Sequence, residues 1–405
     1  MSNDKNYDVG VVGLGVAGAF AALKIVHNNK NVKTLLVEAG CRSRKRRPQM
    51  FSFLGLFPNS NGQLYTSDLQ KVEELTTKSK TKLAFDWFKK NTEEMINFKI
   101  IKDKKPLVSV IKNIAKAGFD IKLNDYIQLF PSEIHNLSKF VSDQIEEKSN
   151  ITSIYNTDVD KITKENGMFN LTIGEDIFKC KKIILCIGRS GWRQAHEIFN
   201  QFGIIENNDY ADIGIRVEMD DSLMKDFNHS HCSMSKNGLS IGPLSFSGTV
   251  IPEDHVDMVI SAFRSNESRW LSNKVSFNLL SRRLFKDEAV EQISRIGQLT
   301  FLLTNDRVAK EKISTLINKK SKLSIMPEYD WLADSIRQVS SFMPEVINKG
   351  HFHFPTMLPI TSKVKLNKSL ETEVDGLYLA GETGQISGLL GSAVSGVIVG
   401  TELCK

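Results

Sequence analysis

The chain has 405 residues, of which 41% are hydrophobic and 25% are charged, and its formal net charge is +6. This is the composition of an ordinary soluble globular protein, and the length favours two domains. The sequence has no run of 18 or more apolar residues and no CxxC pair among its five scattered cysteines, which excludes a membrane-spanning helix and argues against a zinc site or a redox-active disulfide.

The first predicted element is a buried strand, Val9 to Val12, which starts too early to leave room for a signal peptide. With the scattered cysteines, this predicts a cytoplasmic protein. Gly13, Gly15 and Gly18 follow with the spacing GxGxxG and lead into a helix over residues 17–26. Gly13 allows a tight turn, Gly15 lets a pyrophosphate approach the backbone, and Gly18 lets the helix pack closely on the sheet.

Glu38 ends the next apolar run, KTLLVE, 20 residues after Gly18. A carboxylate at this place accepts hydrogen bonds from the ribose hydroxyls of a dinucleotide and repels the 2′-phosphate of NADP. Strand, glycines, helix, second strand and acid arrive in order. The N-terminal segment therefore predicts a site for the AMP half of a dinucleotide.

A basic run comes next, because five of the six residues from Arg42 to Arg47 are lysine or arginine. Two interpretations stay open. The run is a solvated loop with one or two arginines on the cofactor phosphates, or it is a patch for nucleic acid or another polyanionic partner. Aromatic residues, which stack on single-stranded bases, are not interleaved with the run.

The following segments are predicted from periodicity and punctuation. Residues 41–68 are rich in Gly, Pro, Asn and Ser and are predicted as a loop. Helices are predicted over residues 69–98, 106–117 and 131–147, with Ser132 as the N-cap of the third.

Strands follow from Ile151. Val159 comes after the first of them, at a position from which the backbone can contact adenine. Asn166–Gly167 predicts a hairpin turn. Residues 182–187 predict a buried strand that ends in Gly188 and Arg189, where the chain returns to the nucleotide.

Residues 203–352 are predicted to form a second domain. Its strands are expected over residues 211–219 and 255–263, and its helices over residues 287–296, 306–318 and 330–339. No second GxGxxG precedes a helix, so a separate NAD(P)H domain is not expected.

The C-terminal segment, GLYLAGETGQISGLLGSAVSG, is a strand followed by an acid and a small-residue helix. Glu382 can accept a hydrogen bond from a ribitol hydroxyl. The amides of a helix opening within Gly384 to Ala393 can face the N1–C2=O edge of an isoalloxazine ring. Two such segments, more than three hundred residues apart, predict FAD, because FAD is long enough to need both.

Four stretches, GVVGLGVAGAFAALKI, IILCIGRSGW, ADIGIRVEM and the C-terminal segment, resemble two-domain FAD-dependent oxidoreductases, and more narrowly a poorly characterised group of FAD-dependent dehydrogenases. The resemblance implies an α/β fold in which a Rossmann-type FAD-binding domain is split by an inserted α+β substrate domain. The boundaries are 1–202 and 353–405 for the FAD-binding domain and 203–352 for the insertion. Two signatures depart from the group's pattern, at GLFPNSNGQLYTSD and HCSMSKNGLSIGP.

The expected cofactor-binding residues come from five places in the chain: Gly13, Gly15, Val16, Ala17, Gly18, Glu38, Ala39, Arg42, Val159, Gly188, Arg189, Gly381, Glu382, Gly388, Leu389 and Leu390. Substrate-side candidates are Arg193 for anion binding and His351 or His353, which alternate along one strand, for proton transfer. A catalytic thiolate at Cys232 is the less favoured interpretation, and no metal site is expected.

The predicted function is an FAD-dependent oxidoreductase, of dehydrogenase or oxidase type, that transfers a hydride or electrons between the flavin and a small organic substrate. One alternative keeps the flavin but modifies nucleic acid, tRNA or a hypermodified DNA base, which the basic run would bind. A second alternative is a non-catalytic FAD-binding protein.

Overall fold

The structure, a computed structural model, describes residues 5–42, 53–55, 57–207, 210–254, 259–264, 271–285, 289–359 and 363–404. The chain divides into two compact units. Unit 1 comprises Met1–Lys99, Ile127–Asn207 and Thr361–Lys405, and unit 2 comprises Ile100–Tyr126 and Asn208–Ile360. Unit 2 is thus built from two insertions. Residues 100–126 and the strand at residues 351–359 pack in unit 2, whereas the sequence-based boundaries assign residues 100–126 and 353–359 to the FAD-binding domain.

Unit 1 contains a Rossmann-type sheet with the strand order β7-β2-β1-β10, and β22 also pairs with β10. All four pairings are parallel. The strands are β1 (Asn6–Val12), β2 (Thr34–Glu38), β7 (Ile151–Tyr155), β10 (Asp176–Leu185) and β22 (Leu377–Leu379). An antiparallel hairpin, β8 (Lys161–Glu165) and β9 (Met168–Ile173), extends the sheet through β10.

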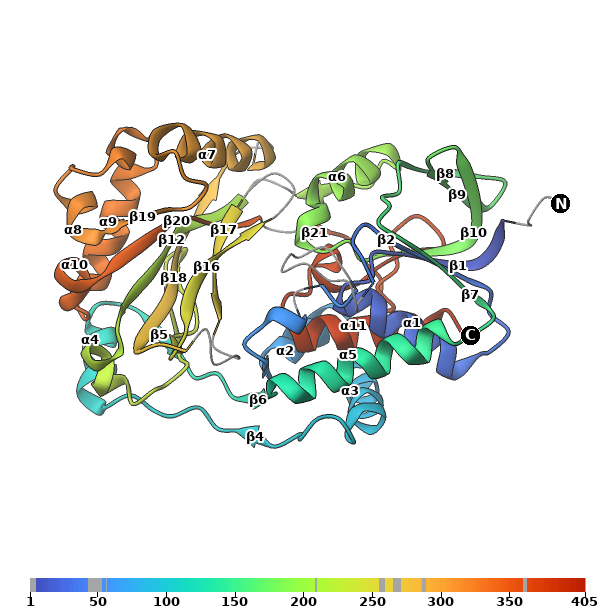
Figure 1. Cartoon of the computed structure of the whole chain (residues 1–405), viewed down its shortest axis with the longest axis horizontal. Coiled ribbons are helices and arrows are strands. Elements are labelled where there is room, and N and C mark those ends of the chain that lie inside the picture. The colour runs from blue at the N-terminus through green and yellow to red at the C-terminus, as the bar shows by residue number, and fades with distance from the viewer. Residues whose placement is uncertain are drawn as a thin grey trace. The chain divides into compact units, whose positions relative to one another are not determined.

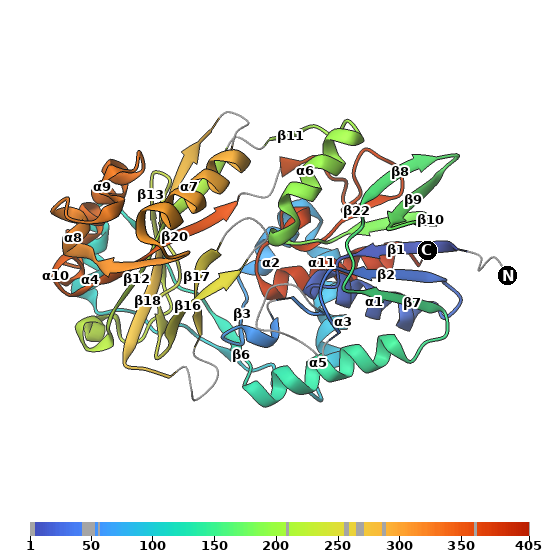
Figure 2. The ribbon, with the colours of Figure 1, turned by 45° about the horizontal axis from the view of Figure 1, so that its top comes forward.

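Helices cover both faces of this sheet (Figures 1 and 2). One face packs against α1 (Val16–Asn28), α5 (Pro131–Glu146) and α11 (Leu389–Glu402) in a core that includes Val9, Val11 and Ile184. The other face packs against α6 (Trp192–Gln201) in a second core that includes Leu35 and Ile183. Neighbouring residues of one strand enter different cores because side chains alternate across a strand.

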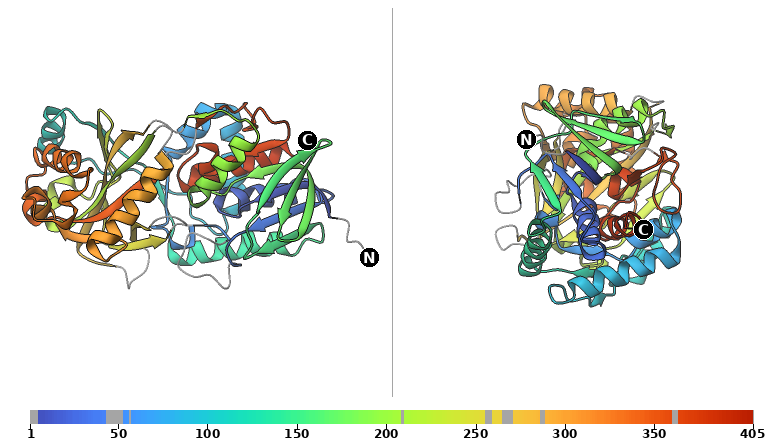
Figure 3. Two further views of the ribbon diagram at one scale, coloured as in Figure 1. Left: turned by 90° about the horizontal axis from the view of Figure 1, so that it is seen from above. Right: turned by 90° about the vertical axis from the view of Figure 1, so that its right-hand side faces the viewer.

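The α1 and α11 helices lie side by side, although they come from opposite ends of the chain (Figure 3). Glycines permit the approach. A Cβ atom on Gly396 would lie 2.1 Å from the carbonyl oxygen of Ala17, and one on Gly400 would lie 2.7 Å from that of Ala21. Any side chain at these positions would overpack the interface.

The local predictions for unit 1 hold with several corrections. The helix predicted over residues 69–98 is two helices, Asp68–Leu75 and Lys78–Thr92, and residues 93–98 are not helical. Asn166 and Gly167 both have positive φ and form the β8–β9 turn as predicted. The predicted N-cap Ser132 is wrong, because α5 starts at Pro131 and the carboxylate of Glu133 accepts a hydrogen bond from the Phe130 N–H at 2.8 Å. The predicted loop 41–68 contains a short 3-10 helix and a strand. The other elements of this unit are η2 (Phe57–Asn59), β3 (Gln63–Tyr65), α2 (Asp68–Leu75), α3 (Lys78–Thr92), η3 (Arg189–Gly191), β11 (Glu206–Asn207), β21 (Lys363–Val364) and η7 (Gly381–Gly384).

Unit 2 is an α+β structure around an antiparallel sheet with the order β19-β20-β12-β18-β14-β13-β5, and β15 also pairs with β18. The central strands are β12 (Tyr210–Asp220), β18 (Lys274–Leu284) and β20 (His351–Pro359). Figure 1 shows α8, α9 and α10 on one face of this sheet. The remaining strands are β5 (Asp120–Lys122), β13 (Ser233–Lys236), β14 (Leu239–Ile241), β15 (Ser245–Phe246), β16 (Thr249–Asp254), β17 (Val259–Arg264) and β19 (Ala309–Lys312). The helices are α4 (Val108–Lys116), η4 (Asp221–Phe227), α7 (Ala289–Thr304), α8 (Ile313–Ile317), η6 (Lys322–Ile325), α9 (Tyr329–Ser340) and α10 (Glu345–Lys349). Two short strands, β4 (Ile100–Ile101) and β6 (Tyr126–Gln128), lie where the chain enters and leaves the first insertion.

One helix prediction in unit 2 is wrong over part of its length. Residues 306–318 were expected to be helical, but residues 309–312 form the edge strand β19, which pairs with β20, and only residues 313–317 are helical. Pairing with a neighbouring strand overrides the local helical preference of a lysine- and glutamate-rich segment.

Candidate functional site

The turn between β1 and α1 has the geometry that its glycines predict. Gly13 has φ +90°, and a Cβ atom there would lie 2.6 Å from the carbonyl oxygen of Cys186. A Cβ atom on Gly18 would lie 1.9 Å from the carbonyl oxygen of Gly13. Gly15, by contrast, caps the N-terminus of α1, and a Cβ atom there would meet no described atom within 4 Å. Gly13 and Gly18 are thus required for packing, and Gly15 borders open space at the positive end of a helix.

The first turn of α1 contributes the amides of Val16, Ala17 and Gly18 to this helix end, and it contains no acidic residue. Beneath it, the thiol of Cys186 donates hydrogen bonds to the carbonyl oxygens of Val12, at 3.2 Å, and Gly13, at 3.0 Å. Burial raises the pKa of this thiol. Cys186 therefore supports the turn as a packed neutral group, as its place in an apolar strand predicts.

Glu38 is buried at the end of β2, and its carboxylate is fixed by two backbone amides. The N–H of Leu14 donates to Oε2 at 2.6 Å, and the N–H of Gly40 donates to Oε1 at 2.8 Å. Ala39, which lies between Glu38 and Gly40 in the chain, is exposed. Each carboxylate oxygen can accept a further hydrogen bond, so the group is preorganised to receive hydroxyl donors beside the glycine turn.

Arg42 extends from the same edge of the sheet and lies over the ring of Tyr155, with 5.2 Å between the guanidinium carbon and the ring centroid. The hydroxyl of Tyr155 donates to Glu146 at 3.1 Å, and burial raises its pKa. The other residues of the basic run, 43–47, lie outside the described residues. The proposed nucleic-acid patch therefore stays a prediction.

Val159 is buried after β7, and its carbonyl oxygen accepts a hydrogen bond from the side-chain amide of Gln194 at 2.6 Å. Gln194 belongs to α6, which starts just after Gly188. The contact joins the position predicted to contact adenine to the segment, residues 188–194, that is predicted to return to the nucleotide.

The segment around Gly188 and Arg189 contacts the C-terminal segment directly. Gly188, with φ +62°, donates its N–H to the hydroxyl of Thr383 at 3.0 Å. The guanidinium of Arg189 forms an ion pair with the carboxylate of Glu382 at 2.5 Å. Thr383 was not among the predicted site residues. The only signal for it in the sequence is its place between two predicted residues and a glycine.

The C-terminal segment also meets the N-terminal one. Gly381 has φ +61°, and a Cβ atom there would lie 2.9 Å from the Cβ of Ala17. Its N–H donates to the hydroxyl of Ser395 at 3.0 Å. The α11 helix begins at Leu389, with the exposed Gly388 as its N-cap at φ +86°, and Leu390 is buried in its first turn. The helix starts later than the sequence indicates, because residues 381–384 form a 3-10 turn and Gln385 is left-handed.

The predicted catalytic candidates lie in different settings. His353 is buried in β20, with its Nε2 3.7 Å from Oε2 of Glu218, and this nitrogen has no hydrogen-bond partner in the described part of the chain. The neighbouring His353 ring and the Lys310 ammonium lower the pKa of Glu218 to about 2. His351 is half-buried, and burial lowers its pKa. Arg193 is exposed, with its guanidinium carbon 6.0 Å from the Trp192 ring centroid.

Cys232 is buried, and desolvation raises the pKa of its thiol to about 11. A thiol with this pKa is protonated at neutral pH, which weakens the thiolate interpretation. Among the described residues, no group of His, Cys, Asp and Glu side chains is arranged to hold a metal ion, and no helix has the length and apolarity that crossing a membrane requires.

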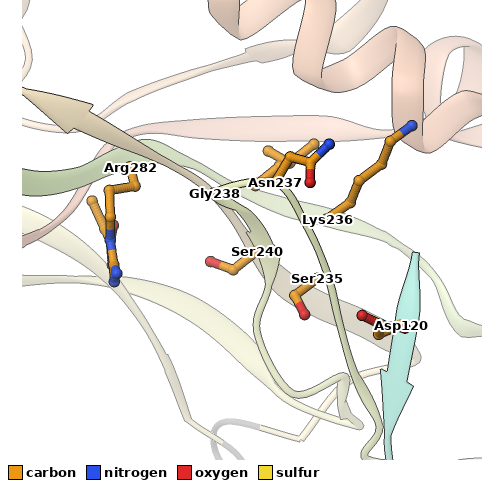
Figure 4. A pocket seen from close by; sticks show the side chains of 9 residues that line it. Asp120, Ser235, Lys236, Asn237, Gly238, Ser240 and Arg282 are labelled. Atoms are coloured by element: carbon orange, nitrogen blue, oxygen red, sulfur yellow. The ribbon is translucent and has the colours of Figure 1, made fainter. Parts of the chain in front are cut away.

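Unit 2 carries a polar cavity of about 260 Å³ at the β13–β14 hairpin. Ser235 and Ser240 lie between Arg282 and Asp120 in this cavity (Figure 4). The guanidinium of Arg282 is already paired with Asp212, at 3.0 and 3.1 Å. The predicted catalytic residues do not line the cavity.

No protein-family model and no curated protein matches the sequence. Among solved structures, the chain is similar to glycine oxidase from Geobacillus kaustophilus, with 12% identity, a TM-score of 0.46, and coverage of 98% of this chain and 94% of that one. It is also similar to L-α-glycerophosphate oxidase from Mycoplasma pneumoniae with FAD bound (12% identity, TM-score 0.45, 98% and 94% coverage). A point mutant of the halogenase PltM in complex with FAD gives 11% identity, a TM-score of 0.46, and 98% and 69% coverage.

Proposed function

We propose that the protein is an FAD-dependent oxidoreductase that acts on a small organic substrate. The observation that carries this proposal is the meeting of the two predicted cofactor segments in unit 1. Gly381 packs on Ala17, and Gly396 packs on the carbonyl of the same residue. Residues more than three hundred positions apart thus surround one sheet edge, as a cofactor with a distant AMP end and flavin end requires.

The residues present fit FAD. Gly15 leaves open space at the N-terminus of α1, where a pyrophosphate is favoured by the helix dipole and backbone amides. Glu38 is held at the strand end as an acceptor for ribose hydroxyls. Gly388, the N-cap of α11, is exposed, and the amides of this helix end would face the flavin. Bound FAD would supply hydride or electron transfer, and the chain would bind, orient and tune it.

The residues that would hold the cofactor fall into three groups. The amides of Gly15 to Gly18 would bind the pyrophosphate, with Arg42 close to the phosphates or the adenine. Glu38 and Val159 would hold the ribose and adenine. The third group would orient the ribityl chain and the flavin: Gly188, Arg189, Gly381, Glu382, Gly388, Leu389 and Leu390.

For proton transfer on the substrate side we favour His353 over His351. The Nε2 of His353 lies 3.7 Å from Oε2 of Glu218, and no described residue forms a hydrogen bond with this nitrogen. His351 is half-buried, and burial lowers its pKa.

The experiment is spectroscopic. The purified protein is expected to show the visible absorbance of bound flavin, or to gain it when FAD is added, and the flavin is expected to bleach when a substrate reduces it under anaerobic conditions. A panel of amines, amino acids, NADH and NADPH tests the donor. Protein that neither contains nor takes up FAD would overturn the proposal. FAD that binds but is reduced by no donor would favour the non-catalytic alternative.

A further inference from the structure

A carboxylate from another helix lies at the N-terminal end of α11. A Cβ atom on Gly388 would lie 2.1 Å from Oδ2 and 2.5 Å from Oδ1 of Asp68, the first residue of α2. A Cβ atom on Gly391, in the first turn of α11, would lie 3.3 Å from both the Cβ and the carbonyl oxygen of the same aspartate. The Asp68 carboxylate therefore occupies the space that Gly388 leaves free, and Gly391 packs on Ile386 and on the same aspartate.

This carboxylate faces a helix end that has no acid of its own. The first turn of α11 contains no acidic residue, and its N-cap Gly388 has no side chain. The positive end of a helix dipole stabilises an anion placed within the first turn. Asp68 supplies that anion from a distance of 320 positions along the chain, at the end of the segment GLFPNSNGQLYTSD in which the sequence departs from the family it resembles.

We propose that Asp68 is a tuning residue that lowers the reduction potential of the bound flavin. The inference rests on the proposed function, in which the N1–C2=O edge of the flavin lies at the N-terminus of α11. A bound flavin that takes up two electrons and one proton would carry a negative charge near N1. Charge near N1 tunes the cofactor. The Asp68 carboxylate offsets the positive end of the helix and repels that new charge, so it disfavours the reduced, anionic flavin relative to the oxidised one.

The test compares midpoint potentials of the full-length, FAD-loaded protein and its Asp68→Asn variant, measured by reduction with dithionite in the presence of a redox dye. Removal of the charge is expected to raise the potential. A tenfold shift of the equilibrium toward reduced flavin corresponds to about 30 mV for a two-electron couple. The matched control is Glu73→Gln, the same change of charge at an exposed position of α2, and it is expected to leave the potential unchanged.

Two further variants separate charge from shape and guard against misfolding. Asp68→Glu keeps the charge and is expected to keep a potential close to that of the native protein. Asp68→Ser removes the charge with a smaller side chain and carries the same test if Asp68→Asn folds poorly. A native protein without flavin would defeat the proposed function itself. A native protein that binds FAD, with charge-removing variants whose potential equals its own, would overturn only the role of Asp68.

Discussion

Arg189 and Glu382 form an ion pair although they are 193 positions apart in the chain. Both were predicted independently as cofactor-binding residues, and the structure shows that they also bind each other. The Arg189→Gln variant leaves Glu382 half-buried without this cation, whereas the double variant Arg189→Gln/Glu382→Gln removes both charges. We expect the double variant to lose less FAD affinity than the sum of the losses in the two single variants. The difference, which is the coupling between the two side chains, is expected to be about 0.5–1 kcal/mol. Fluorescence titration of the apoprotein with FAD measures it. Strictly additive effects would show that the pair does not contribute to the site.

Gly15 gives the sharpest test of the pyrophosphate position. Its φ is −58° and its Cβ position is open, so Gly15→Ala is expected to leave the melting temperature almost unchanged. The new side chain projects into the space assigned to the phosphates, so FAD affinity is expected to fall at least tenfold, or about 1.4 kcal/mol. Full affinity in a folded Gly15→Ala variant would place the phosphates elsewhere.

The α1–α11 interface predicts a different response at Gly396. A Cβ atom there would lie 2.1 Å from the carbonyl of Ala17, so Gly396→Ala must separate the helices. We expect the free energy of unfolding to fall by roughly 1–3 kcal/mol, measured in urea. An alanine in a helix interior is otherwise more stable than a glycine. The control Thr401→Ala, at a half-buried position of the same helix, is expected to change stability less. A Gly396→Ala variant as stable as the native protein would contradict the close packing.

Glu218 predicts how stability depends on pH. Its pKa of about 2 in the folded protein is below the ordinary value of 4.5. The stabilisation is therefore complete above about pH 4.5 and is lost as the pH falls toward 2. Its upper limit is roughly 3 kcal/mol. Glu218→Gln is expected to lower the free energy of unfolding at pH 7, and the difference from the native protein should shrink between pH 4.5 and 2. A difference that does not change over this range would refute the role of the His353 and Lys310 contacts. Glu73→Gln, at an exposed position, controls for the loss of a carboxylate.

Alkylation of Cys232 tests whether its thiol is packed or reactive. With a pKa of about 11 and a buried side chain, it is expected to resist alkylation by iodoacetamide in the native protein at neutral pH and to react after unfolding. Peptide mass spectrometry reads out the modified cysteines. Cys186, whose pKa is also raised by burial, serves as an internal reference. Rapid native labelling of Cys232 would revive the thiolate interpretation.

Local signals in the sequence were sufficient for much of unit 1. Backbone sterics explain three of its features: the positive φ of Gly13, the close contact at Gly18 and the Asn166–Gly167 turn. In each case the presence of glycine or asparagine at that position is enough to predict the conformation. The carboxylate at Glu38 follows from its distance to the glycines. These features need no knowledge of distant contacts.

The features that were missed depend on residues distant in sequence. Asp68 packs against Gly388, and the hydroxyl of Thr383 accepts a hydrogen bond from Gly188. Neither contact produces a recognisable pattern in the sequence around either residue. Strand β19 was predicted as helix because its pairing with β20 is decided by tertiary structure rather than by propensity. Residues 100–126 pack in unit 2, and their place there includes the pairing of β5 with β13, which joins residues more than a hundred positions apart.

The glycine contacts between α1 and α11 have a consequence for biosynthesis. The helix that follows the Gly13–Gly18 turn, α1, is synthesised before α11, which packs on its backbone. Until then, the face of α1 around Ala17 and Ala21 lacks its neighbour. The packing of α11 on α1 can therefore form only after Gly396 and Gly400 have been synthesised. A polypeptide released before Gly396 would leave this face of α1 uncovered.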